Sequence, residues 1–395
     1  MKFLIHNRKK IVVIFFLGVI FLSLIGVNVL RYKENKSIVS QNLINIGEIS
    51  DITEKLKNAE KQFLDLKKED QNKINQTLAK RIADIEDTYR STLTIYESIQ
   101  DLRSQKQNVD DLEKSFALVL NMLATVNYPS ASASLKTLSK NIDTMKQKMN
   151  ETTSFASTAI ASNTPPASGY QTQRVKVGGA EFTVGIVAAD LNTTKVIVDT
   201  ASDGTCTNNC PVLSLGDYVS RSGAFAGING SYFCPASYPS CAGKENSFDT
   251  LLMNKNKTYF NSDNNVYSSV PAVIFTGNSA RFISRSSDWG RDTGVDAVLA
   301  NQPLLVLNGE SVFGGDDEAK RSSRGIRNFV GATGNMVYIG AVYSATAAEA
   351  AQVLKTMGIA NALNLDSGGS SAIWSGGYKL GPGRNIPNAI LFVHK

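Results

Sequence analysis

Histidine is almost absent from this sequence. Among 395 residues there are two, His6 and His394, and both lie at the ends of the chain. Ser-His and Cys-His nucleophile pairs and HExxH zinc sites need a histidine inside the fold, so these classes of active site are excluded. Any catalysis would depend on carboxylates, Arg, Lys, Tyr, Ser or Asn.

A basic excess is missing from the C-terminal part of the chain. Residues 173–395 contain 18 Lys and Arg against 17 Asp and Glu, whereas the whole chain has a formal charge of +6. Nucleic-acid-binding domains gather Lys and Arg on one face. We therefore expect no nucleic-acid partner.

Residues 11–30 contain no charged residue at all. As a helix they would span about 30 Å, the thickness of a bilayer core. Basic residues at positions 2 and 8–10 precede them, which places the N-terminus in the cytoplasm. Residues 1–35 are thus expected to form a cytoplasmic tip and a single-pass anchor in the cell membrane, with an extracytoplasmic C-terminal domain. A cleaved signal peptide is the alternative, although no A-x-A-like site is visible.

Proline is missing from residues 36–128, where Lys, Glu, Asp, Gln, Asn and Leu are frequent. Apolar residues recur there at steps of three and four, a spacing typical of coiled coils and helical bundles. The phase of this repeat slips near residues 70–72 and 103–108, which suits stutters in a rod or turns in a bundle. We predict a helical stalk over residues 36–150, able to mediate homo-oligomer formation.

Two segments interrupt this helical pattern. Residues 127–134, NYPSASAS, should break the helix. Residues 151–172 are rich in Ser, Thr and Ala and contain Pro165 and Pro166, so they are expected to form a linker.

From residue 173 onward, short apolar runs alternate with Gly, Asn, Asp and Ser. A helix is predicted over residues 346–357, with Thr346 and Glu349 forming a capping box and Gly358 ending the helix. The fold class is α+β: a strand-rich mixed C-terminal domain over residues 173–395, preceded by a transmembrane helix and a coiled-coil or bundle stalk. Strands are predicted at residues 182–188, 195–199, 272–276, 304–307, 336–342 and 389–393.

All four cysteines lie in this C-terminal domain. An even number in an exported domain predicts two disulfides. Local pairing would join Cys206 to Cys210 and Cys234 to Cys241, but three connectivities are open. A zinc site is the alternative, although the spacing does not match the common structural patterns.

Four segments of the domain carry the residues suited to chemistry: 227–233 (GINGSYF), 327–331 (RNFVG), 362–371 (ALNLDSGGSS) and 384–390 (RNIPNAI). In the third, a strand end delivers Asp366 into a loop of small residues whose backbone N–H groups can approach an anion. Two arginines, Arg327 and Arg384, can supply fixed positive charge for a phosphate or carboxylate. This combination, without histidine, suits cleavage of a sugar–phosphate bond.

In order and spacing, these segments resemble the phosphodiester glycosidase family, the domain of the uncovering enzyme that removes N-acetylglucosamine from phosphodiester-linked mannose. The family shows an NGGFF-like segment, an RTAIG-like segment, NLDGGGSS after a helix, and a late R-x-x-x-N-A-I strand. Here the corresponding residues are 229–233, 327–331, 364–371 and 384–390. Residues 296–309 also look like the family segment that precedes its arginine motif. The resemblance covers residues 173–395 and excludes the stalk.

The resemblance implies a hydrolase that cleaves glycosyl-1-phosphodiester bonds in surface glycans or related polymers. Its expected partner is a phosphodiester-linked carbohydrate, with Asp366 and Arg327 as catalytic groups. A second carboxylate is expected for glycoside chemistry, and Asp249 and Glu310 are the candidates. No cofactor is required by the sequence, and a divalent cation stays open. The expected substrate-binding residues are Asn229, Gly230, Asn364, Gly368, Gly369, Ser370, Ser371 and Arg384.

The sequence departs from the family pattern at several positions. Ser231 and Tyr232 replace Gly and Phe, and residues 328–330 replace Thr-Ala-Ile. Ser367 replaces the first Gly of the triple, which would cost energy if that position needs positive φ. Because of these departures, the alternative function is a non-catalytic module, carried on a helical stalk, that binds anionic surface polysaccharide.

Overall fold

In this computed structural model the described residues are 26, 31, 33, 35, 36, 41, 47, 51–58, 71–153, 159–263 and 268–395. The expected membrane anchor at residues 11–30 therefore lies, apart from Gly26, outside the described residues. Among the helices that are described, none is both long enough and apolar enough to cross a membrane. The chain divides into two compact units, Met1–Asp84 and Ile85–Lys395. The candidate site lies in the second unit.

Three helices lie in residues 71–153 of the expected stalk: α2 (Gln71–Ser104), α3 (Asp110–Ala124) and α4 (Tyr128–Thr153). Residues 51–58 are helical as well. Side chains from all three share one buried cluster, which includes Ile99, Val119 and Ile142. This shared core identifies the segment from Ile85 to Thr153 as a bundle rather than a single rod. The phase slip expected at residues 103–108 corresponds to the turn between α2 and α3.

The break between α3 and α4 is shorter than expected. Only residues 125–127 are non-helical, and α4 already begins at Tyr128. Pro129 therefore lies in the first turn of α4, where a missing backbone N–H costs nothing. Most of the NYPSASAS segment is helical for this reason.

The largest sheet has eight strands in the order β1-β2-β3-β14-β13-β15-β11-β12. Its pairs are antiparallel except for β1 and β2. β2 begins at Gly169, so the sheet starts inside the expected linker. The bounds are β1 (Ile160–Ala161), β2 (Gly169–Val177), β3 (Ala180–Asp190), β11 (Leu304–Leu307), β12 (Glu310–Ser311), β13 (Gly325–Thr333), β14 (Met336–Ala345) and β15 (Asn361–Asn364).

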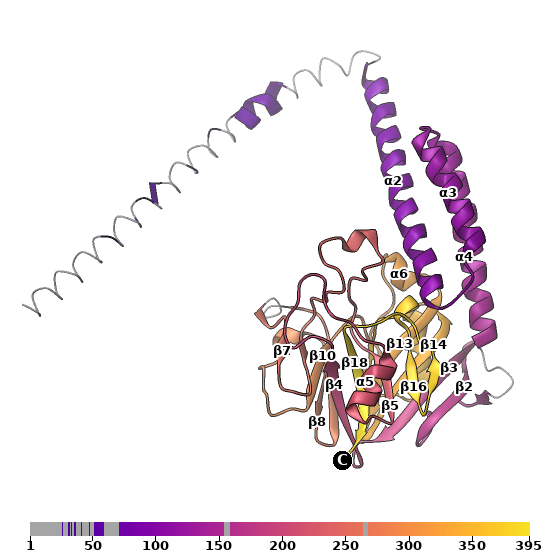
Figure 1. The fold of residues 1–395 in the computed structure, drawn as a ribbon, viewed down its shortest axis with the longest axis vertical. Helices are drawn as coiled ribbons and strands as arrows, with labels where there is room; N and C mark the ends of the chain where they lie inside the picture. Colours follow the sequence, from indigo (N-terminus) through magenta and orange to yellow (C-terminus); the bar gives the residue numbers. More distant parts are fainter. Residues whose placement is uncertain are drawn as a thin grey trace, which may run out of the picture. The chain divides into compact units, whose positions relative to one another are not determined.

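Two further sheets have five strands each, in the orders β17-β16-β5-β18-β4 and β7-β6-β10-β8-β9. The first comprises β4 (Thr194–Thr200), β5 (Ala226–Asn229), β16 (Ile373–Ser375), β17 (Tyr378–Leu380) and β18 (Asn388–His394). The second comprises β6 (Leu252–Met253), β7 (Tyr259–Phe260), β8 (Ala272–Thr276), β9 (Ser279–Ile283) and β10 (Ala297–Ala300). Short helices connect the strands: α5 (Leu215–Ser222), α6 (Ala319–Ser322), α7 (Ala347–Thr356), η1 (Pro239–Cys241), η3 (Ser286–Asp288) and η4 (Gly368–Ser370). Figure 1 shows the strands gathered beneath the lower ends of α2 and α4.

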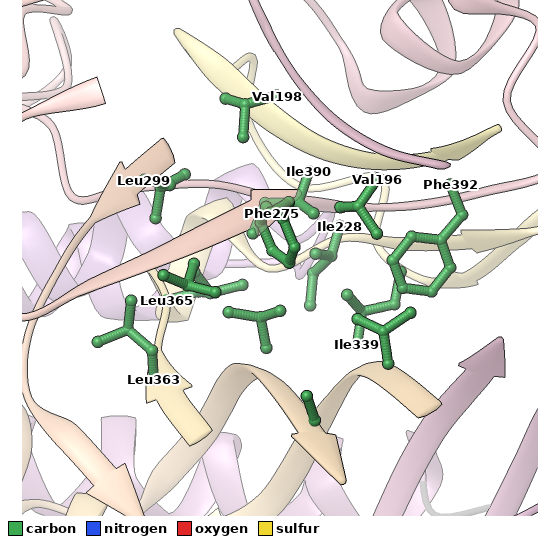
Figure 2. Packing of buried hydrophobic residues seen from close by; sticks show 14 of the residues in the cluster. Val196, Val198, Ile228, Phe275, Leu299, Ile339, Leu363, Leu365, Ile390 and Phe392 are labelled. Carbon is green, nitrogen blue, oxygen red and sulfur yellow. The ribbon is translucent and has the colours of Figure 1, made fainter. Parts of the chain in front are cut away.

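One apolar core lies between the three sheets. Ile228 of β5, Phe275 of β8 and Ile339 of β14 meet there, and Leu363 and Leu365 join them from the β15 segment (Figure 2). Because successive residues of a strand face opposite sides, buried Leu363 and Leu365 fix the direction of the chain on both sides of Asn364. This packing sets the position of Asp366.

Helix α7 covers the other face of the large sheet. Its buried residues share a cluster with Ile186 and Phe329. The Thr346 side chain accepts from the Glu349 backbone N–H, and the Glu349 side chain accepts from that of Thr346. The predicted capping box is therefore confirmed, and Gly358, with φ of +78°, follows the helix end as expected.

The α+β class and all six predicted strands of the C-terminal domain are confirmed, with ends that differ by a few residues. The local disulfide pairing is also confirmed, as Cys206 joins Cys210 and Cys234 joins Cys241. The second disulfide closes a loop that contains η1 and follows β5 directly. This loop, residues 234–241, reaches the candidate site.

Candidate active site

Asp366 is held at a point where two sheets meet. Its backbone N–H donates to the Gly230 carbonyl at 3.0 Å. Its carbonyl accepts from Nδ2 of Asn229 at 2.7 Å and from Nδ2 of Asn328 at 2.8 Å. Asn229 ends β5 of a five-stranded sheet, and Asn328 lies on β13 of the eight-stranded sheet. Residues far apart in the sequence therefore fix the backbone of Asp366.

The surroundings of the Asp366 carboxyl group raise its pKa to about 6. Burial is the main cause, because it disfavours the charged form, and the negative charge of Asp101 adds to it. The Ser370 side chain, the charge of Arg384 and the Ser367 backbone N–H act in the opposite direction. A carboxyl group with this pKa changes charge near neutral pH and suits proton transfer.

The loop after Asp366 turns sharply at Gly368, where φ is +66°. Ser367 has φ of −137°, which is extended backbone, so the serine at this position causes no strain. Gly369 allows a very close approach: an added Cβ would lie 2.2 Å from Nη2 of Arg384 and 2.7 Å from Oδ1 of Asp101. Because Gly369 has no side chain, the charged groups of Arg384 and Asp101 can lie close to the backbone of this loop.

Arg384 is the cation of the site. Its backbone N–H donates to the Gly369 carbonyl at 2.9 Å, which ties the loop before β18 to the loop after β15. Its side chain is 11% exposed, and Nη2 contacts Oδ1 of Asp101. Burial acts to lower the Arg384 pKa, but the neighbouring acidic groups, Asp101 first, outweigh it and raise the pKa. Nε and Nη1 of Arg384 are buried and have no hydrogen-bond partner among the described residues.

Tyr238, in the disulfide-closed loop, completes this cluster. The Arg384 guanidinium lies 4.9 Å from the centre of its ring, within the range of a cation–π interaction. Its hydroxyl donates to Oδ1 of Asp101 at 2.6 Å. Burial, followed by the charge of Asp101, raises the pKa of Tyr238 well above its usual value, so the hydroxyl stays protonated.

Buried asparagines form hydrogen bonds that fix the loop around Asp366. Nδ2 of Asn328 donates to Oδ1 of Asn229 at 2.9 Å and to Oγ of Ser371 at 3.0 Å. Nδ2 of Asn364 donates to the Tyr232 hydroxyl at 2.7 Å. Asn229 is fully buried, and its oxygen also accepts from the Ala372 backbone N–H. The Asn229 amide positions the Asp366 loop, and its expected contact with the substrate stays a prediction.

Close packing against Asn388 explains why position 230 is a glycine. An added Cβ would lie 1.9 Å from Oδ1 of Asn388. The expected contact residues Ser370 and Ser371 are both 2% exposed. Ser370 is bonded to the Asp366 carboxyl group, while Ser371 accepts from Asn328. The structure thus brings these residues together around Asp366.

Arg327 lies near the site but is engaged by the backbone. Nε donates to the Ala345 carbonyl at 2.9 Å and Nη1 to the Lys320 carbonyl at 2.7 Å, while Nη2 contacts the Ser323 carbonyl. Burial lowers its pKa, and Tyr232 opposes this. Arg327 therefore holds the segment around α6 and supplies positive charge behind Tyr232.

The two candidates for a second carboxylate are both exposed. Glu310 is exposed and paired with Lys355 at 2.6 Å. It follows Gly309, whose N–H donates to Ala360, so it lies at the opposite end of β15 from Asp366. Asp249 is exposed, between the buried Phe248 and Thr250. The carboxylate that adjoins the Asp366 site is instead that of Asp101, from α2.

Three residues of this site are not among those that the sequence predicts: Asp101, Tyr238 and Asn328. Asn328 lies in the segment 327–331, at a position where the sequence departs from the family pattern. Tyr238 follows the first motif closely, inside the Cys234–Cys241 loop, which could have drawn attention to it. Asp101 carries no local signal, since it lies in a helical segment 283 positions from Arg384.

Comparison with known protein families gives one match. Residues 222–393 match the family model described as phosphodiester glycosidase. This part of the chain is therefore a phosphodiester glycosidase family domain. It contains Asp366, Arg384, Tyr238 and the buried asparagines described above. Asp101 lies outside the matched residues.

Solved structures with similarity to the chain include a hypothetical protein from Synechocystis. It is 14% identical, with a TM-score of 0.40, over 57% of this chain and 62% of that one. This chain thus spans less than two thirds of that protein. Another is the catalytic domain of zebrafish N-acetylglucosamine-1-phosphodiester alpha-N-acetylglucosaminidase. It is 14% identical, with a TM-score of 0.45, over 60% of this chain and 87% of that one. No curated protein matches the chain.

Proposed function

We propose that this protein hydrolyses glycosyl-1-phosphodiester bonds in surface glycans or related polymers, as a membrane-anchored, extracytoplasmic enzyme. The observation that carries the proposal is the buried guanidinium of Arg384, two of whose nitrogens have no protein partner within the described chain, beside the carboxyl group of Asp366. Buried donors of this kind are costly unless a ligand accepts from them. The family of the domain supports a sugar phosphodiester as that ligand.

The reaction breaks the bond between the anomeric carbon and a phosphate oxygen. That oxygen leaves with the phosphomonoester, the anomeric carbon gains the hydroxyl group of water, and the remaining proton of that water goes to the phosphomonoester. Arg384 would bind the phosphate and stabilise its growing negative charge. Asp366, once ionised, would stabilise the positive charge that develops at the anomeric carbon. Phosphate is a good leaving group, so strong general-acid help is not required.

The test uses the full chain, purified in detergent, with a panel of sugar-1-phosphodiesters and with and without added Mg²⁺ or Ca²⁺. Release of reducing sugar and phosphomonoester would be measured for the wild type, for Asp366→Asn and for an exposed control, Asp203→Asn. We expect Asp366→Asn to lower turnover by about 100-fold or more, with the control unchanged.

The same assay would include Asp101→Asn, because Asp101 contacts Arg384. Absence of turnover in both the wild type and Asp101→Asn would contradict the proposed hydrolysis, provided that circular dichroism shows both to be folded. Retained binding of a phosphodiester glycan in that case would support the binding module instead.

A further inference from the structure

The end of helix α2 lies directly against the candidate active site. Oδ1 of Asp101 contacts Nη2 of Arg384 and accepts from the Tyr238 hydroxyl at 2.6 Å. Oγ of Ser104 donates to the Gly369 carbonyl at 3.1 Å. The motif loop after Asp366 is therefore covered by residues of the helical bundle, which the family match does not include.

We propose that Asp101 is an internal ligand of the phosphate-binding position, which a substrate phosphate must displace from Arg384. This inference rests on the proposed function, in which Arg384 binds the substrate phosphate. A carboxylate oxygen held by a guanidinium and a hydroxyl resembles a phosphate oxygen in charge and in hydrogen bonding. Asp101 thus acts as a built-in competitor of the substrate.

The geometry over the glycines supports this assignment. A Cβ added at Gly369 would lie 2.5 Å from Oγ of Ser104 and 2.7 Å from Oδ1 of Asp101. A Cβ at Gly368 would lie 3.4 Å from Oδ2 of Asp101. Both oxygens of Asp101 therefore face the backbone of the loop that was expected to bind an anion.

Asp101 uses only part of the binding capacity of Arg384. It contacts Nη2, whereas Nε and Nη1 are buried and unpartnered within the described chain. Arginine binds phosphate best through two parallel N–H donors. A phosphate that replaced Asp101 could accept from these additional nitrogens. The site is therefore better matched to a phosphate group than to the carboxylate that occupies it.

Neighbouring contacts keep Asp101 in place. One turn earlier on α2, buried Glu97 contacts the Ser240 hydroxyl and lies 3.6 Å from Nζ of Lys320. Leu102, adjacent to Asp101, is fully buried in the core of the bundle. These contacts make the covered state the resting state. A ligand whose site is open for only a fraction of the time binds with an affinity reduced by that fraction.

Inorganic phosphate binding by the full chain in detergent tests the inference without relying on turnover. Isothermal titration calorimetry would compare the wild type with Asp101→Asn and with Asp87→Asn, an exposed residue on the same helix that undergoes the same charge change. We expect Asp101→Asn to bind phosphate at least tenfold more tightly than the wild type. Asp87→Asn should match the wild type, and Asp101→Asn combined with Arg384→Gln should lose the gain.

Equal phosphate affinity in the wild type and Asp101→Asn would overturn the inference. So would a loss of turnover in Asp101→Asn without tighter phosphate binding, because Asp101 would then be a catalytic carboxylate. Tighter phosphate binding without turnover on any sugar phosphodiester would uphold the internal ligand and contradict the proposed hydrolysis. The two ideas can therefore fail separately.

A wild-type measurement covers the case in which Asp101→Asn does not fold. A crystal structure of the wild-type chain grown with phosphate should show phosphate on Arg384 with the Asp101 carboxylate displaced. Phosphate bound to Arg384 while Asp101 still contacts Nη2 would overturn the inference, as would saturating phosphate with no density at Arg384.

Discussion

At the scale of the residue, Asp366 combines a fixed backbone with a carboxyl group that resists ionisation. Its pKa is raised to about 6 by burial and by Asp101, against the effects of Ser370, Ser367 and Arg384. In the unfolded chain the same carboxyl group would ionise near pH 3.8. The folded state therefore binds its proton more tightly. Stability attributable to this group is greatest below about pH 4 and falls as the pH rises to about 6.

Replacing Asp366 by Asn should remove the loss of stability that ionisation of the buried carboxyl group causes. At pH 7 we expect Asp366→Asn to raise the free energy of unfolding by about 1–3 kcal/mol, since one pKa unit corresponds to about 1.4 kcal/mol. At pH 4 the difference from the wild type should shrink to less than about 1 kcal/mol, because Asp366 of the folded state is then protonated and the unfolded carboxyl group is only partly ionised. Urea unfolding followed by circular dichroism at both pH values measures this. An equal effect at the two pH values would contradict the raised pKa.

Asn328 gives a second prediction at this scale. Its Nδ2 lies within hydrogen-bond distance of Asn229, Asp366 and Ser371, and the residue is fully buried. Asn328→Ala would remove one donor from each of these three acceptors and leave a cavity in a fully buried position, so we expect a loss of about 2–3 kcal/mol in the free energy of unfolding. Asn121→Ala, on the exposed side of α3, serves as the control. A loss no larger than that of the control would show that these bonds do not hold the site.

The residues of the site differ in how far sequence could predict them. Asp366 and Arg384 lie in short local motifs, and the structure brings them together. The sequence points to a second carboxylate within the same domain, at Asp249 or Glu310, because the helical segment shows only a packing pattern. Asp101 could not be inferred there, since contact with Arg384 depends on how the bundle packs against the sheets. Tertiary contacts of this kind leave no periodic signal in the sequence.

At the scale of the element, local sequence patterns predict the strands and helices better than they predict the residues of the site. The strands at residues 272–276 and 304–307 have the predicted bounds, because apolar runs bounded by turn residues specify buried strands. The capping box of α7 was predicted for a similar reason. The end of α3 was harder to predict, since Pro129 is compatible with both a break and a helix start. The β2 start at Gly169 was missed because its polar residues resemble a linker.

The loop closed by Cys234 and Cys241 is the element whose change is most informative. It carries Tyr238 and Ser240, which contact α2. Replacing both cysteines by Ser should lower the free energy of unfolding by about 2 kcal/mol, as expected for a short closed loop. If the contacts of this loop hold Asp101 against Arg384, the affinity of this double variant for phosphate should rise at the same time.

The matched control replaces Cys206 and Cys210, whose loop has no contact with α2 among those described here. That variant should lose stability without a change in phosphate affinity. Calorimetry of phosphate binding and urea unfolding on the two variants would give both quantities. A rise in affinity for both pairs would point to general loosening rather than to release of Asp101.

At the scale of the whole molecule, the site is built from two parts with different origins in the sequence. The family domain supplies Asp366, Arg384 and Tyr238. The bundle, which belongs to the same compact unit from Ile85 to Lys395, supplies Asp101. The sequence divided these parts into a stalk and an enzyme domain. Their contact at Arg384 ties the helical bundle to the candidate site.

Residues 11–30 give the last prediction at this scale. Twenty uncharged residues preceded by basic ones should hold the chain in a membrane with the C-terminal domain outside. The full chain should therefore stay with the membrane fraction after an alkaline carbonate wash, and protease added to intact cells should degrade the domain. A chain that lacks residues 2–30 should remain inside the cell. Recovery of a shortened chain from the medium would instead show that the segment is a cleaved signal peptide.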